Sequence, residues 1–213
     1  MDKALNIVRE CQRIMPLKSK KTDRRTNRTR RSLSTALVEL VKEKRFDDIT
    51  VQDVIDRADV GRSTFYSHFR DKEDLFQKDW ERFLDMLAQQ IDWDQAGQAS
   101  FIPVVFLFRH LQEVQTFYKG LVRSRMTDSI FKSGVSYLSR QIETALTVRL
   151  RDKPTPTIPI PILSHYLASE LFTLLQWWLD QKMPYPPERM DEIFHELVNP
   201  ACKSVLNFAA ARS

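Results

Sequence analysis

The sequence predicts an all-α protein. Apolar side chains recur at intervals of three and four residues along most of the chain, which is the spacing of one helix face. Only four of the 213 residues are glycine, far below the average of about 7%. Seven of the ten prolines fall in two clusters, residues 154–161 and 184–187. These clusters are expected to end helices, because proline lacks a backbone N–H and clashes with the preceding turn.

The composition excludes several classes of protein. An apolar content of 42% is enough for a hydrophobic core, so the chain is not a disordered one. The two cysteines, Cys11 and Cys202, lack the spacing of a metal site and are typical of a reducing compartment, so we expect a cytoplasmic protein without a metal. Four scattered glycines cannot form a glycine-rich nucleotide-binding loop, and no cofactor is expected. No apolar run has the ~18 residues that a membrane helix needs.

Positive charge is concentrated near the N-terminus. Residues 18–31 carry eight basic side chains and one acidic one, a net charge of +7, whereas residues 81–213 carry equal numbers of each sign. A basic block on an otherwise balanced chain indicates an anionic partner, with nucleic acid or a membrane surface as the first candidates.

The N-terminal segments differ in how strongly they are patterned. Residues 4–15 place most of their apolar side chains on one face and predict a short helix. The basic stretch 18–27 has no apolar periodicity and is interpreted as a mobile arm. The first well-patterned helix is expected over about residues 27–44.

Two short helices and a longer one are predicted next. Thr50 is the expected N-cap of a helix over 51–57, because its hydroxyl can accept an unpaired backbone N–H and Asp53 suits the positive helix end. After a four-residue turn, a second short helix is expected over 62–68. A longer helix with a buried aromatic stripe should follow over about 71–91.

The second half is predicted to hold four longer helices. Their expected ranges are about 101–119, 129–151, 162–182 and 187–210. The proline clusters bracket the third of them, and Pro200 marks a kink in the last.

The two short helices have the dimensions of a helix-turn-helix, in which the first supports the second and the second fits a major groove about 12 Å wide. We expect the apolar side chains of this motif to pack against the neighbouring helices: Val54, Ile55, Val60, Phe65 and Phe69. We expect its polar side chains to stay accessible to base edges and phosphates: Arg62, Ser63, Thr64, Ser67 and His68.

Residues 28–76 resemble the DNA-binding domain of the TetR family of bacterial transcriptional regulators. The resemblance rests on four segments in register: Thr50-Val51, Ala58-Asp59-Val60, Thr64-Phe65-Tyr66-Ser67-His68-Phe69 and Lys72-Glu73-Asp74-Leu75. Trp177-Trp178 before a proline-rich turn, with Phe194-His195-Glu196-Leu197, is similar to the C-terminal region of one subgroup.

The resemblance implies a DNA-contacting set. Arg62 and Thr64 would approach base edges or phosphates, and Tyr66 and His68 would contact phosphates. Ser63 stands where the family often has glycine and would add a base or phosphate contact. Lys72 and Thr50 would offer helix ends to the DNA backbone. The basic arm would lie along the duplex or enter a minor groove, and we assign it the contacts Arg24, Arg25 and Arg28.

The turn departs from the usual family pattern. The family commonly has Ala-Gly-Val-Ser, whereas this chain has Ala58-Asp59-Val60-Gly61. Aspartate tolerates a left-handed backbone better than most residues, and glycine is a fair N-cap, so the turn is expected to form.

The resemblance also implies a domain organisation. We expect an N-terminal extension and arm over 1–26, a three-helix helix-turn-helix domain over 27–74, and a helical effector-binding and dimerisation domain over 75–213. The expected effector pocket, whose aromatic members equally suit a plain core, comprises Phe108, Tyr118, Tyr137, Tyr166, Glu170 and Trp177. The expected dimer interface comprises Leu171, Leu175, Trp178, Phe194, Leu197, Ala201 and Val205.

The expected function is that of a homodimeric repressor, released from a palindromic DNA operator by a small-molecule effector. The expected partners are therefore double-stranded DNA, an effector and a second copy of the chain, with no membrane. Two alternatives remain open at this point. One is a non-specific nucleic-acid-binding or membrane-surface module that uses the basic arm, and the other is a small helical enzyme, for which no catalytic constellation is visible.

Overall fold

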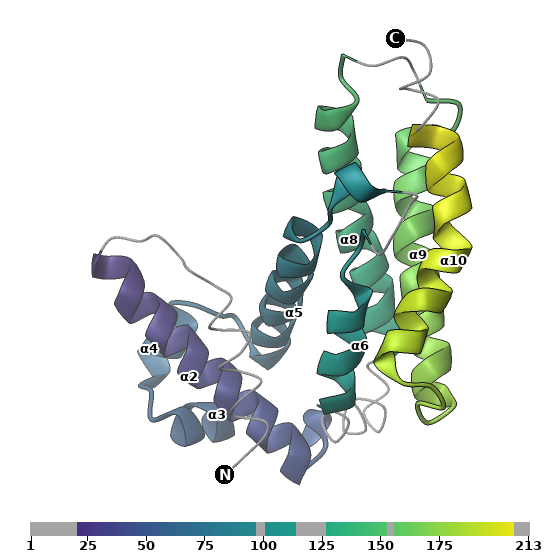
Figure 1. Ribbon diagram of the computed structural model, residues 1–213. Helices are drawn as coiled ribbons and strands as arrows, with labels where there is room; N and C mark the ends of the chain where they lie inside the picture. The colour runs from purple at the N-terminus through teal and green to yellow at the C-terminus, as the bar shows by residue number, and fades with distance from the viewer. Residues whose placement is uncertain (1–20, 97–100, 114–126, 153–155, 207–213) are drawn as a thin grey trace. The chain divides into compact units, whose positions relative to one another are not determined.

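Every regular element in the described part of the protein is a helix, which confirms the predicted all-α class (Figure 1). The computed structural model describes residues 21–96, 101–113, 127–152 and 156–206. The helix predicted over 4–15 lies outside these ranges. Of the described residues, those up to Phe83 form one compact unit, and nearly all of those from Leu84 onward form a second.

The first unit is a small helical domain. It holds α2 (Lys21–Glu43), the 3-10 turn η1 (Phe46–Asp48), α3 (Val51–Ala58), α4 (Arg62–Tyr66) and most of α5 (Lys72–Gln89). Its core joins the apolar stripe of α2 to side chains of the shorter helices, among them Leu33, Leu37, Leu40, Val54, Ile55, Phe65, Phe69 and Leu75. Four of the five apolar side chains predicted to pack here are buried, and Val60 is half-buried.

The first helix begins earlier than predicted. The prediction of a mobile arm over 18–27 is wrong for residues 21–27, because α2 starts at Lys21. Lysine and arginine are good helix formers, and adding residues to an existing helix is easier than nucleating one. Residues 21–27 can therefore extend α2 although they have no apolar periodicity, because the later part of the helix is packed through Leu33 and Leu37.

The second unit consists mainly of longer helices. After η2 (Trp93–Gln95) come α6 (Val104–Glu113), α8 (Thr127–Arg149), α9 (Ile160–Asp180) and α10 (Pro187–Leu206). The prolines lie as predicted around α9: Pro159 is its N-cap and Pro161 is in its first turn, while Pro200 lies within α10. The two positions at the start of α9 suit a residue that has no N–H to donate, whereas Pro200 removes one backbone hydrogen bond from the interior of α10.

The beginning of α6 is held by two side chains of α10. The carboxylate of Asp191 accepts the N–H of Val105 at 3.2 Å, and Nε2 of His195 accepts the N–H of Ile102 at 3.3 Å. Nδ1 of His195 lies 2.8 Å from the carbonyl oxygen of Asp191, to which it donates in this tautomer. Because the first backbone donors of a helix have no partner within it, these contacts stabilise the start of α6.

Helix α8 approaches α9 closely at Gly134. A Cβ atom at this position would lie 2.5 Å from the ring of Phe172, whose side chain is only 2% exposed. The absence of a side chain at Gly134 therefore lets the two helices pack around this ring.

We expect Gly134→Ala to lower the free energy of unfolding by about 1–3 kcal/mol, although alanine is the better helix former. The added Cβ would lie 2.5 to 3.2 Å from three atoms of the buried Phe172 ring, so the ring or the helices would have to shift. Gly61→Ala is the matched control, because a Cβ there would meet only Oγ1 of Thr64 at 3.8 Å. Urea unfolding measures both changes, and wild-type stability in Gly134→Ala would contradict the close packing.

Candidate nucleic-acid interface

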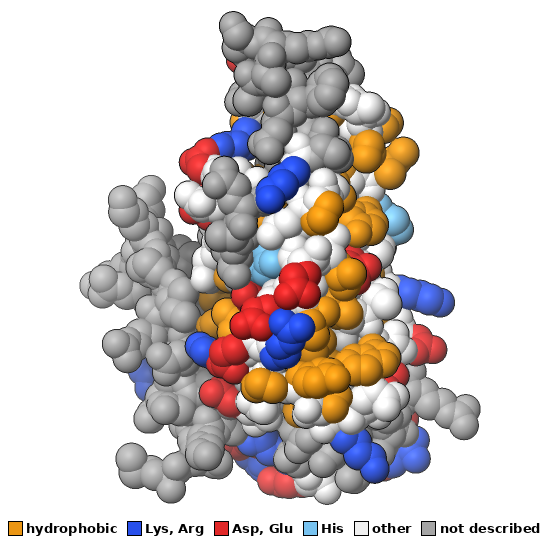
Figure 2. Space-filling view, turned by 45° about the vertical axis from the view of Figure 1, so that its right-hand side comes forward, with side chains coloured by type: hydrophobic (Ala, Val, Ile, Leu, Met, Phe, Trp, Pro, Cys, Tyr) orange, Lys and Arg blue, Asp and Glu red, His pale blue; other side chains and the backbone are white. Residues whose placement is uncertain are grey.

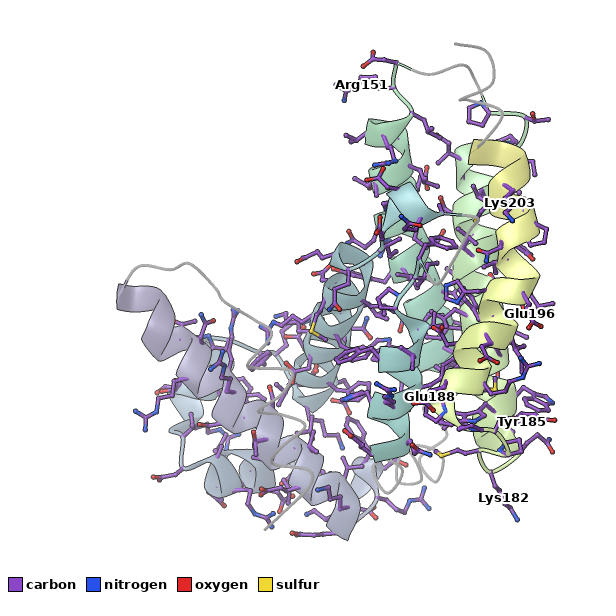
Figure 3. The ribbon with its side chains drawn as sticks, in the orientation of Figure 1. Arg151, Lys182, Tyr185, Glu188, Glu196 and Lys203 are labelled. Carbon is purple, nitrogen blue, oxygen red and sulfur yellow. The ribbon has the colours of Figure 1, made fainter. Side chains whose placement is uncertain are left out.

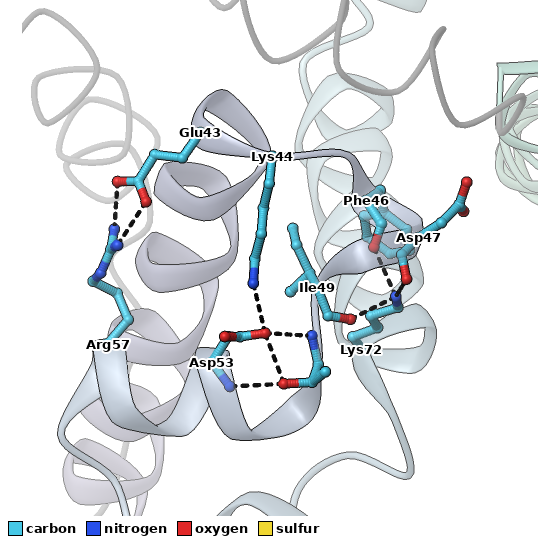
Figure 4. Close-up of polar contacts among 9 residues, drawn as sticks. Glu43, Lys44, Phe46, Asp47, Ile49, Asp53, Arg57 and Lys72 are labelled. Atoms are coloured by element: carbon cyan, nitrogen blue, oxygen red, sulfur yellow. Dashed lines mark hydrogen bonds and ion pairs between the residues drawn. The ribbon is translucent and has the colours of Figure 1, made fainter.

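The start of α3 is fixed by a reciprocal capping box, as predicted for Thr50. Its hydroxyl accepts the N–H of Asp53 at 3.1 Å, and the Asp53 carboxylate accepts the N–H of Thr50 at 2.7 Å (Figure 4). Nζ of Lys44 lies 2.8 Å from the same carboxylate. Hydrogen bonds from Lys44 and from the side chain and backbone of Thr50 hold the pKa of Asp53 well below its usual range.

A second contact joins α3 to α2. The guanidinium of Arg57 donates to both carboxylate oxygens of Glu43, at 2.9 and 2.8 Å (Figure 4). Such two-pronged pairing fixes direction as well as distance. Both ends of α3 are therefore tied to α2 or to the residues that follow it.

The turn between α3 and α4 forms as its sequence predicts. Asp59 has the left-handed backbone angles φ 52° and ψ 52°, and Gly61 is the N-cap of α4. The second helix is shorter than predicted, since regular α4 ends at Tyr66 and not at residue 68. The N–H groups of His68 and Phe69 both bond to the carbonyl of Phe65, so the chain continues as a tight turn.

Helix α4 has one buried and one accessible face. Phe65 is fully buried, whereas Arg62, Ser63 and Tyr66 are exposed, and Thr64 is half-buried. The guanidinium of Arg62 lies 5.7 Å from the centre of the Tyr66 ring, within the range of a cation–π contact. The accessible face therefore pairs the positive charge of Arg62 with the aromatic ring of Tyr66.

The His68 imidazole lies at the far end of this segment and is half-buried. Burial lowers the pKa of His68, and the positive charges of Arg30 and Lys78 lower it further. The Lys78 ammonium donates to the His68 carbonyl at 3.2 Å and pairs with Asp74 at 2.9 Å, so α5 is tied to the end of the α4 segment.

Lys72 has partners that the sequence interpretation did not include. Its ammonium donates to the carbonyls of Phe46, Asp47 and Ile49 at 2.7, 3.0 and 2.6 Å (Figure 4). The side chain is only 12% exposed. The expected phosphate contact of Lys72 stays a prediction, and its ammonium is bound to backbone oxygens in this structure.

The predicted arginine contacts of the basic segment fall on α2. Arg28 is exposed, while Arg24 and Arg25 lie in the helical part whose side chains are not described. By helical periodicity the exposed Arg28 and Arg31 share one face, opposite the buried Leu33. Helix formation therefore places these two charges on the same side of α2.

The predicted effector-pocket residues of the second unit do not converge. Phe108 is fully buried with its ring edge-on to Trp178, at 5.0 Å between centroids, and the Tyr137 hydroxyl donates to Asp85 at 2.9 Å. Glu170 is half-buried, whereas Tyr166 and Trp177 are 39% and 45% exposed. Tyr118 lies outside the described residues. Tyr166 and Trp177 lie on the exposed side of α9, so they do not point into the core that the buried side chains of the same helix enter.

Four side chains of the predicted dimer interface are buried within a single chain. Leu171, Leu175, Trp178 and Phe194 are at most 1% exposed within a single chain, so they have no surface left for a second copy. Leu197 is 48% exposed and Ala201 is half-buried, as an interface requires, and the side chain of Val205 is not described.

A different set of apolar side chains is exposed on α9, on α10 and at the turn between them. It comprises Ile162, Tyr166, Trp177, Tyr185 and Leu197, and we call it the apolar stripe (Figure 2). The Trp177 and Tyr185 rings are stacked, with centroids 6.3 Å apart and 18° between planes. Positions 162, 166 and 177 follow helical spacing, a signal that the sequence interpretation assigned to a pocket.

The edge of this surface along α10 is charged. Arg189 pairs with Glu192 at 2.7 Å and with Glu196 at 3.3 Å. Figure 3 shows Tyr185 at the α9–α10 turn and Glu196 and Lys203 along α10. An apolar patch with a polar rim is the usual organisation of a protein–protein contact surface.

Other kinds of site find little support in the described ranges. In these residues no three or more His, Cys, Asp or Glu side chains are grouped so that they could hold a metal ion. Nor does any described helix have the length and apolar character to cross a membrane.

Two family descriptions match the chain. Residues 33–78 match "Bacterial regulatory proteins, tetR family", and residues 104–200 match "Transcriptional regulator C-terminal region". The first range contains α3, α4 and their capping residues, and the second contains most of the described second unit.

Two curated relatives are similar in sequence. The uncharacterized HTH-type transcriptional regulator YxbF of Bacillus subtilis is 25% identical over 193 residues, covering 85% of this chain and 47% of the relative. The dhaKLM operon transcriptional activator DhaS of Lactococcus lactis is 25% identical over 97 residues, covering 44% of this chain and 48% of DhaS. The chain thus spans about half the length of the curated relatives that it matches.

Solved structures share the fold. A TetR transcriptional regulator from Streptococcus agalactiae is 26% identical with a TM-score of 0.50, covering 83% of this chain and 97% of the other. A structure of the dihydroxyacetone kinase operon activator DhaS superposes with a TM-score of 0.61 at 16% identity, with 83% and 97% covered. These families and neighbours are transcriptional regulators and not enzymes.

Proposed function

Since the chain belongs to the TetR family of bacterial transcriptional regulators, we propose that it regulates transcription by binding a specific DNA sequence through α4. The observation that carries this proposal is the two-faced α4. Buried Phe65 fixes the helix against the core, while Arg62, Ser63 and Tyr66 stand exposed on its other side. Side chains of these types contact base edges and phosphates in a major groove.

The basic N-terminal part of α2 would increase the affinity for DNA in a way that does not depend on the base sequence. Arg28 and Arg31 share one exposed helix face, and each phosphate that these charges neutralise releases condensed counterions. The remaining predicted contacts, Thr50, Thr64 and His68, would position the motif on the DNA backbone. Sequence would be read mainly from the start of α4.

The apolar stripe supports a homodimer as the DNA-binding form. It presents five large exposed apolar side chains on α9, α10 and their turn, beside a row of charged groups on α10. Contact between two copies would cover side chains that otherwise face water. Two-fold symmetry would then present two copies of α4 to the half-sites of a palindromic operator.

We further propose that the regulator is a repressor released by a small molecule. An effector that binds better to a conformation with misplaced α4 helices lowers the affinity for DNA by that difference. The partial similarity to DhaS, which is described as an activator, makes activation the second candidate. A reporter under the chain's own operator separates them: deleting the gene raises expression if it represses and lowers expression if it activates.

We expect Arg62→Ala to weaken binding to the operator by about 1–3 kcal/mol, because it removes an exposed side chain suited to a bidentate base contact. Arg151→Ala is the control for loss of one exposed positive charge in the second unit. Fluorescence anisotropy with the chain's own upstream region and with scrambled DNA gives both affinities. Equal binding of wild-type protein to the two DNAs would refute specific regulation.

We expect Leu197→Glu to shift the protein from dimer to monomer and to weaken operator binding, since it places a charge on the apolar stripe. Val148→Glu is the matched control, because Val148 is 63% exposed on α8 and lies outside the stripe. Sedimentation velocity measures the assembly state. A dimeric Leu197→Glu protein would show that the contact between copies lies elsewhere.

A further inference from the structure

Lys72 is the first residue of α5, and its ammonium contacts an earlier part of the chain. It donates to three carbonyls of residues 46–49, more than twenty residues away in sequence. The same nitrogen lies 4.9 Å from the centre of the Phe46 ring and 3.8 Å from the carboxylate of Glu73. The lysine thus closes a compact cluster.

The chemistry of this cluster is specific to lysine. An ammonium has three donors that diverge from one atom, and here three carbonyl oxygens lie within 3.0 Å of that atom. A guanidinium carries its donors on a flat, wide fork that matches a carboxylate or a phosphate. Arginine therefore cannot reproduce these three bonds, although it can replace lysine in a contact with a phosphate.

The carbonyls that Lys72 binds lead directly into the helix-turn-helix. They belong to η1 and to Ile49, the residue before Thr50, whose capping box starts α3. From the other side, Lys44 bonds to Asp53 in that same box. The start of α3 is therefore held both by α5, through Lys72, and by the residue that follows α2.

We propose that Lys72 is a positioning residue for DNA recognition, which sets the direction of α3 and hence of α4 by fixing residues 46–49 to the start of α5. This inference rests on the proposed function. Lys72 would then support operator binding through the placement of α4, and its ammonium would stay on the carbonyls in the complex.

The test uses the full chain with Lys72→Met, Lys72→Arg and the control Arg45→Met. Arg45 is an exposed cation beside the same turn, and its guanidinium pairs with the carboxylate of Asp47 at 3.1 Å. Operator affinity is measured over a range of salt concentrations, at temperatures where each variant is folded. We expect both Lys72 variants to bind at least about tenfold more weakly, with a salt dependence like that of the wild type, and Arg45→Met to bind nearly as the wild type does.

The opposite pattern would overturn the proposal. If the ammonium contacts a phosphate, Lys72→Arg binds as the wild type does and Lys72→Met loses about 0.9 from the logarithmic salt slope. If Lys72 matters only for stability, the folded variants bind normally. A wild-type protein that fails to bind any operator would instead count against the proposed function.

A measurement on the wild-type chain needs no variant to fold. Acetic anhydride labelling followed by mass spectrometry compares Lys72 with Lys78, which is also ion-paired but has a side chain that is 41% exposed. We expect Lys72 to react much more slowly in the absence of DNA. Equal reactivity of the two lysines would show that the ammonium does not stay on the carbonyls, and would overturn the proposal.

Discussion

The placement of α3 is the constraint on which the rest of the first unit depends. Helix α4 has only five residues, which is too short to be stable by itself, so its position must come from its neighbours. Phe65 anchors it to the core, and the left-handed turn at Asp59 joins it to α3. The direction of α3 is in turn fixed by Lys44 at its capping box and by Arg57 at its last turn.

The same contacts arrange the charges of this unit. The carboxylates of Glu43, Asp53 and Asp74 are each paired with a basic side chain of the unit, Arg57, Lys44 and Lys78 respectively. These ion pairs are partly exposed and contribute little to stability one by one. Their greater effect is on the surface potential, because a neighbouring cation balances each of these three carboxylates while Arg28, Arg31 and Arg62 remain exposed. Electrostatic attraction of DNA would therefore act on α2 and α4.

Local patterns predicted local structure well. The capping box at Thr50 and the left-handed Asp59 were predictable because each depends on residues within a few positions of one another. The start of α2 was missed because residues 18–27 have no apolar spacing, and apolar spacing was the signal used to predict helices. The proline clusters marked the limits of α9, since proline acts through its own backbone.

Side-chain partners that are distant in sequence were not predictable. Lys72 donates to backbone carbonyls of residues 46–49. Every residue has a backbone carbonyl, so no residue type in the sequence marks these acceptors. On α9, large apolar side chains occur all around the helix, so the sequence alone did not separate buried Leu171 and Trp178 from exposed Tyr166 and Trp177. The structure shows which side of α9 is buried. We therefore propose the apolar stripe as the contact between copies, in place of the buried side chains.

Amide hydrogen exchange of the full chain, with and without a DNA fragment from its own upstream region, tests the central claim most directly. The central claim is that the exposed face of α4 and the basic face of α2 bind DNA, and that the contacts at the start of α3 already hold the motif in place in the free protein. It predicts slower exchange on DNA in residues 61–68 and in the first turns of α2, with the amides at the start of α3 already protected in the free protein. Protection by DNA only in α9 and α10, with residues 61–68 unchanged, would contradict it.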